Sequence, residues 1–75
     1  MDKALWQKHL ALARTHVDQG RRLVADQISV LDELRRDGHS TDLACRTLRN
    51  YEELLDLHIA DCQRLEADLA NTGKA

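Results

Sequence analysis

The sequence contains no proline and no phenylalanine, and it has one tryptophan and one tyrosine among its 75 residues. Residues that favour strands and tight turns are therefore scarce, whereas leucine, alanine, arginine and the acidic residues, which suit helices, are abundant. The two cysteines, Cys45 and Cys62, would lie roughly 25 Å apart along one helix, too far for an intrachain disulfide. Free thiols suit a reducing compartment, so we expect a cytoplasmic protein.

Long apolar runs are also missing. No segment approaches the ~20 apolar residues of a membrane span, and residues 1–9 do not have the apolar core of a signal peptide. We therefore expect a soluble chain without a membrane partner. The formal net charge of −2 argues against a dedicated nucleic-acid binder. Charge is spread unevenly, because residues 1–22 are mainly basic and residues 51–70 mainly acidic.

Apolar residues recur at alternating intervals of three and four over two long segments, which predicts two helices that pack like a coiled coil. In the first segment, about residues 2–36, heptad positions a and d hold Leu10, Val17, Val24 and Leu31, and Trp6, Ala13, Gly20, Gln27 and Leu34. In the second, about residues 41–70, they hold Leu48, Leu55, Cys62 and Leu69, and Ala44, Tyr51, His58 and Leu65.

The break between the two patterns, residues 37–41, predicts a short turn. Gly38 can adopt the left-handed conformation that ends a helix, and Ser40 or Thr41 can cap the next one. Short connections make helices antiparallel neighbours. The fold class predicted is therefore all-α, an antiparallel two-helix hairpin forming a single domain over residues 1–75, with a frayed tail at residues 71–75.

Folding about this turn pairs residues whose numbers sum to about 78. That register places Gly20 opposite His58, His16 beside Cys62, and Gln27 near Tyr51, where we expect a buried hydrogen bond that fixes the register. It also lays the basic start of the first helix beside the acidic end of the second, so the charge pattern and the apolar pattern favour the same hairpin.

Several apolar side chains flank the a and d positions and would stay in water in a lone hairpin. They are Leu23, Ile28, Val30, Leu54 and Ile59. Leaving them exposed forgoes on the order of 10 kcal/mol, comparable to the whole stability of a small domain. We therefore expect a homodimer that forms a four-helix bundle with two-fold symmetry.

The residues that carry this pattern are Thr15-His16-Val17, Gly20, Leu23-Val24, Gln27, Leu31, Leu34, Gly38, Ala44, Leu48, Leu55 and His58. In this spacing the chain resembles a group of short bacterial helical-hairpin proteins of unassigned function. The resemblance covers most of the chain, and it implies a fold and no activity.

One set of side chains has metal-ligand chemistry. His58 and Cys62 lie four residues apart on one helix face, and the predicted register adds His16, so the three are candidate ligands for zinc. A fourth ligand would come from Asp61, water or a second chain. The alternative is that Cys62 is a small core residue and that the histidines fill space.

Two further hypotheses concern the first helix. His9 and His16 lie seven apart on one stripe, which suggests a phosphoacceptor of the kind found in histidine-containing signalling bundles, although neither has the sequence context of such families. Arg14, Arg21 and Arg22 would form a basic ridge for RNA phosphates, as in the dimeric helical-hairpin RNA binder of plasmid copy control, which the architecture resembles.

No glycine-rich phosphate loop and no nucleophile-base-acid set is present, so we expect no enzyme and no cofactor. The function predicted is a structural or protein-interaction module, a small regulator or adaptor that binds another protein through exposed helix faces. Metal binding through His16, His58 and Cys62 is the first alternative, and RNA binding by a hairpin dimer is the second.

Overall fold

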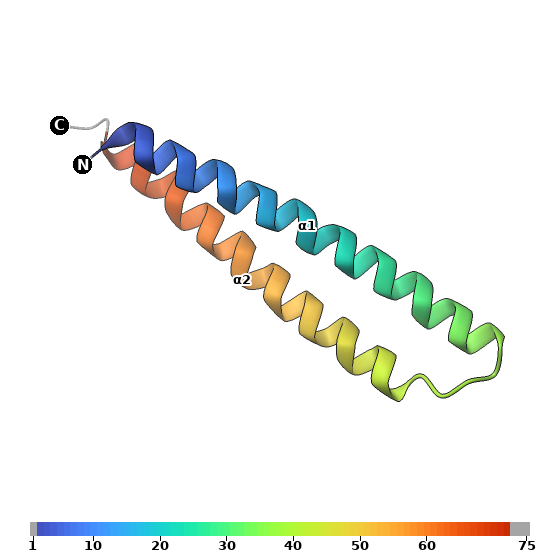
Figure 1. Cartoon of the computed structure of the whole chain (residues 1–75). Helices are drawn as coiled ribbons and strands as arrows, with labels where there is room; N and C mark the ends of the chain where they lie inside the picture. Colours follow the sequence, from blue (N-terminus) through green and yellow to red (C-terminus); the bar gives the residue numbers. More distant parts are fainter. Residues whose placement is uncertain (1, 73–75) are drawn as a thin grey trace.

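The chain folds into two long helices joined by one turn, as Figure 1 shows for the computed structural model, which describes residues 2–72. Helix α1 spans Lys3–Arg36 and helix α2 spans Asp42–Thr72. The helices run antiparallel and side by side over a length of 60 Å, and the hairpin is only 14 Å by 12 Å across. The predicted all-α hairpin is therefore confirmed.

The ends of α1 are set by local hydrogen bonds. The Asp2 carboxylate accepts hydrogen bonds from the backbone N–H groups of Ala4 and Leu5, at 3.0 and 3.3 Å, and so caps the first turn. At the other end Gly38 has a φ of +74°, and its N–H donates to the carbonyl of Arg35. His39 N–H donates to the carbonyl of Leu34, at 2.9 Å, which completes the glycine-dependent helix end that the sequence predicts.

Helix α2 begins where the prediction placed it. The carbonyl of Thr41 accepts the first helical hydrogen bond, from Cys45 N–H at 2.8 Å, and Asp42 places a negative charge in the first turn. At the far end the helix continues through Asn71 and Thr72, two residues of the segment predicted to be a frayed tail. The rest of that segment, residues 73–75, lies outside the described residues.

The core between the helices is thin. Among the described residues no side chain is less than 2% exposed. The buried hydrophobic side chains all occupy predicted a or d positions, and they are Leu10, Ala13, Val17, Leu31, Ala44, Cys62 and Leu65. Trp6 packs against one end of this core, as expected for a residue at the open end of the hairpin.

The predicted pairing sum of about 78 fits the core near the open end, where Ala13 and Leu65 line one groove and Val17 and Cys62 another. Around Gly20 the observed neighbours differ from the predicted ones by about one helical turn. The side chain against Gly20 is that of Leu55, and a Cβ on Gly20 would lie 3.1 Å from Leu55 Cδ1. His58, which the prediction placed opposite Gly20, instead pairs with His16. The glycine leaves room for a bulky apolar side chain, and burying leucine there is more favourable than burying an imidazole.

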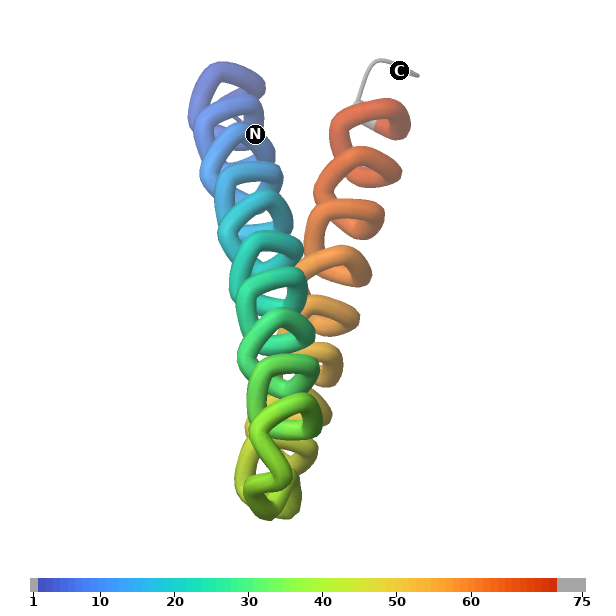
Figure 2. The backbone as a smooth tube through the Cα atoms, turned by 90° about the vertical axis from the view of Figure 1, so that its right-hand side faces the viewer, coloured from blue at the N-terminus to red at the C-terminus, as the bar shows by residue number. Residues whose placement is uncertain are grey.

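The same shift changes the contact of Gln27. Its Nε2 donates a hydrogen bond of 3.1 Å to the backbone carbonyl of Ala44, so the predicted bond to Tyr51 is wrong. The bond still links the two helices close to the turn, and it does so through a carbonyl group whose position no side-chain pattern reveals. Figure 1 and Figure 2 together show that the helices twist around each other: seen from one side they are separated near the turn, and seen from 90° away they are separated at the other end. A constant pairing sum does not account for this twist.

One ion pair joins the basic start of α1 to the acidic end of α2, as predicted. Arg14 of α1 lies 3.7 Å from Glu66 of α2, with both side chains about half exposed or more, so the pair contributes at most about 1 kcal/mol. Within residues 2–72 neither helix has a stretch long and apolar enough to span a membrane.

Candidate functional site: one apolar face across both helices

A stripe of exposed apolar side chains runs along α1 outside the core. Its members are 42 to 55% exposed, and they are Leu5, Leu12, Leu23 and Val30. They follow one another at intervals of 7, 11 and 7 residues, which are close to two, three and two turns of an α-helix. All four therefore lie on one side of α1.

A second stripe lies on α2. Leu43 and Leu54 are separated by about three turns, and Leu57 follows Leu54 at the spacing of neighbours on one helix face. Leu43 and Leu57 are the most exposed large hydrophobic side chains of the described chain, at 71 and 68%. Packing within the hairpin therefore does not explain why an apolar side chain stands at either position.

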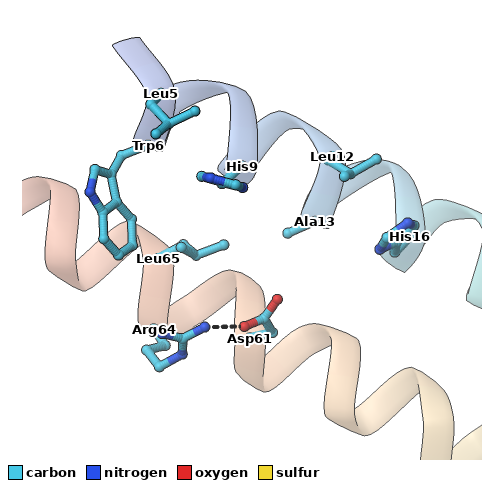
Figure 3. A pocket seen from close by; sticks show the side chains of 9 residues that line it. All are labelled: Leu5, Trp6, His9, Leu12, Ala13, His16, Asp61, Arg64 and Leu65. Carbon is cyan, nitrogen blue, oxygen red and sulfur yellow. Dashed lines mark hydrogen bonds and ion pairs between the residues drawn. The ribbon is translucent and has the colours of Figure 1, made fainter. Parts of the chain in front are cut away.

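The stripes of α1 and α2 lie on the same side of the hairpin, because Val30 and Leu43 line one groove together near the turn. The groove near the open end has a volume of about 380 Å³, and Figure 3 shows its lining: Leu5, Trp6, His9, Leu12, Ala13 and His16 from α1, with Asp61, Arg64 and Leu65 from α2. The groove near the turn is lined by Gln27, Val30, Leu34, Ser40, Leu43, Ala44 and Thr47. We call the surface that holds both stripes the apolar face.

The opposite side of the hairpin has a different character. Its shallower depression is lined by Val17, Arg21, Ile59, Cys62, Gln63 and Glu66, and the ion pair between Arg14 and Glu66 lies there. Ile28, seven residues after Arg21, is its exposed large hydrophobic side chain. Seven of the eight exposed large hydrophobic side chains among the described residues thus belong to the apolar face.

The three predicted zinc ligands do not all point to the same side. The rings of His16 and His58 meet, with 5.1 Å between centroids, and both residues are half-buried. Cys62 lines the opposite depression, where its Sγ lies 3.4 Å from Glu66 Oε1, to which the thiol donates. Among residues 2–72 no group of three or more His, Cys, Asp or Glu side chains is arranged to hold a metal ion.

The thiol of Cys62 is also held in its protonated form. Burial raises the pKa of Cys62, and its hydrogen bond to Glu66 and the charge of that carboxylate raise it further, which outweighs the opposing effect of Arg14. A protonated thiol is neither a good nucleophile nor a good metal ligand. Both cysteines are free, as the sequence predicts.

The remaining candidates are spread over both sides. His9 and His16 both line the groove at the open end, where His9 meets the edge of Trp6 at 6.3 Å between ring centroids. Of the predicted basic ridge, Arg14 is paired with Glu66, and Arg21 lines the same depression as Glu66, so the positive potential of this ridge is partly offset.

Sequence reasoning found the flanking residues Leu23, Val30 and Leu54 but missed the other four residues of the apolar face. The missed residues, Leu5, Leu12, Leu43 and Leu57, occupy heptad position c, which a seven-residue repeat assigns to solvent. An α-helix has 3.6 residues per turn, so position c of one part of α1 lines up with position g eleven residues later. Counting in steps of eleven would have found the stripe.

Comparison of the chain with protein-family models, with curated proteins and with solved structures gave no match, so its function is inferred from its geometry.

Proposed function

We propose that this chain is a non-enzymatic protein-interaction module whose first partner is a second copy of itself. Two hairpins pack through their apolar faces into a four-helix bundle, and the polar outer faces remain for other proteins. The observation that carries the proposal is the concentration of exposed leucine and valine side chains on one face of a hairpin whose own core is thin.

The shape of the hairpin supports this proposal. Its radius of gyration is 17.2 Å, whereas a compact domain of this length has about 11 Å. The whole hairpin is 60 Å long and 14 Å wide, so one side of it offers an area on the order of the 800 Å² per partner that a stable protein–protein interface buries. The face is therefore large enough for a stable dimer.

The energies point the same way. Fully burying one Leu or Val side chain contributes about 1.5–3 kcal/mol, so covering seven half-exposed side chains on each of two copies contributes on the order of 10–20 kcal/mol. Association costs about 4–15 kcal/mol in lost freedom of motion. The free energy of pairing two apolar faces is therefore favourable or close to zero. In the pair, the thin core of each hairpin is covered by the other hairpin.

Sedimentation equilibrium with matched variants tests the proposal. Leu23→Gln lies on the apolar face and Ile28→Gln on the opposite side, and the two parent side chains are almost equally exposed, at 42 and 45%. We expect the wild type and Ile28→Gln to sediment as dimers and Leu23→Gln to dissociate at least tenfold more readily. A wild type that stays folded at 8.6 kDa up to about millimolar concentration contradicts the proposal.

A second candidate function, binding of a divalent transition metal, is supported by the paired rings of His16 and His58. Two imidazoles from each of two copies would supply the four nitrogen ligands that zinc accepts, with bonds of about 2.0–2.1 Å. We expect zinc to raise the melting temperature of the wild type and of Cys62→Ser, but not of His16→Ala or His58→Ala. No shift in the wild type would remove this candidate, and loss of the shift in Cys62→Ser would favour the three-ligand set predicted from sequence.

A further inference from the structure

A two-fold pair uses the same patch on both copies, so that patch has to complement itself. The exposed stripe of α1 has this property. Its intervals of 7, 11 and 7 residues read the same in both directions, with a centre between Val17 and Asp18. A rotation by half a turn about that centre brings each apolar side chain of the stripe to the position of another apolar side chain. This is a stricter condition than hydrophobicity alone.

We infer that the second copy seats with its α1 antiparallel to α1 of the first, about a two-fold axis level with Val17 and Asp18. This inference rests on the proposed self-association and adds its orientation. Leu5 then lies opposite Val30 of the second copy, and Leu12 opposite Leu23 of the second copy. The two turns lie at opposite ends of the bundle.

The structure extends the same axis to α2. Leu55 packs on Gly20 and His58 on His16. The residues of α2 that lie level with the two-fold axis are therefore Leu57 and His58. Leu57, one of the two most exposed large hydrophobic side chains, then meets Leu57 of the second copy. Both pairs of His16 and His58 come to the centre of the bundle.

The charges beside the α1 stripe suit this orientation. Lys8 and Asp26 are 18 residues apart, which is five turns of an α-helix, so both lie along one edge of the stripe. The antiparallel pairing sets Lys8 opposite Asp26 of the second copy, and the symmetry repeats the contact at the other end. Opposite charges placed in this way select one orientation over another.

A parallel pairing fits less well. With both turns at one end, α1 of each copy would face α2 of the other at the same level. Leu12 and Leu5 would then lie over the end of α2 that carries Asp61, Arg64 and Asp68, where Asp61 and Arg64 form an ion pair. Covering these side chains with leucine would remove water from charged groups without new partners.

Disulfide trapping tests the orientation in a chain carrying Cys45→Ala and Cys62→Ala. We expect a mixture of Leu12→Cys and Leu23→Cys chains to form a disulfide-linked dimer on oxidation, and Leu57→Cys to link with itself. Leu12→Cys alone is the matched control. Its two copies would lie roughly 16 Å apart along the length of the helices, beyond the reach of a disulfide. Sedimentation under reducing conditions shows whether each variant still pairs.

A second measurement leaves the apolar face untouched. Spin labels on His39→Cys, an exposed turn position, are expected about 55 Å apart in the antiparallel pair, from the rise of 1.5 Å per residue on either side of the axis. A distance near 20 Å, or a dimer in which the mixed cysteines do not link, overturns the orientation and leaves the self-association standing. A monomer in sedimentation overturns both.

Discussion

At the scale of single residues, Gly20 is a position where the two helices approach closely, because a Cβ there would meet Leu55 at 3.1 Å. We expect Gly20→Ala to change the free energy of unfolding by less than about 1 kcal/mol, since the gain in helix propensity offsets a small movement of the leucine methyl group. Gly20→Val has no such room, and we expect it to lower stability by about 1–3 kcal/mol.

Urea denaturation measures both Gly20 variants, with Ala11→Val at an exposed position of α1 as the control for helix propensity alone. Valine is a better helix former than glycine, so a Gly20→Val variant at least as stable as the wild type would contradict the close packing of Leu55 on Gly20.

The two cysteines should differ in reactivity. The raised pKa of Cys62, caused first by burial and then by Glu66, leaves less thiolate at a given pH, whereas Cys45 is half-buried. We therefore expect iodoacetamide at pH 8 to alkylate Cys45 at least several-fold faster than Cys62, as measured by mass spectrometry of the peptides. In urea the two rates should converge, and equal rates in the folded chain would contradict the burial described for Cys62.

At the scale of elements, the sequence predicts both helices and the turn because their signals are local. Gly38 ends α1 by its own conformational freedom, and the a and d positions contain every hydrophobic residue that is buried within the described part of the chain. The register is not local, because it depends on how Leu55 fits over Gly20 and on a bond from Gln27 to a backbone carbonyl. An error of one turn there moved His16 from Cys62 to His58, and with it the composition of the candidate metal site.

The turn gives a prediction of its own. Gly38 has a positive φ with nothing within 4 Å of where its Cβ would be, so substitution there is opposed by backbone strain and not by crowding. We expect Gly38→Ala to lower the free energy of unfolding by about 1–2 kcal/mol and Gly38→Asn by less, because asparagine tolerates the left-handed conformation better. Chemical denaturation checks this, and an Ala variant as stable as Asn would contradict it.

At the scale of the whole molecule, the paired hairpins should respond to exchange of charges. We expect Lys8→Glu and Asp26→Lys each to weaken the dimer by roughly two- to thirtyfold, since each variant breaks two partly exposed ion pairs that contribute about 0.2–1 kcal/mol apiece, and the double variant to recover the wild-type affinity. Sedimentation at low salt measures the three affinities. Weakening that adds up in the double variant would contradict the contact between Lys8 and Asp26 of the second copy.

The hairpin places the first and last described residues at the same end. In the antiparallel pair these ends lie at opposite tips of a rod about 60 Å long, each beside the turn of the other copy. A body attached to either end of one chain is then held apart from the body attached to its partner. The proposed pair would act as a strut that sets the distance between two attached bodies, and lengthening both helices by whole turns would lengthen that distance in step.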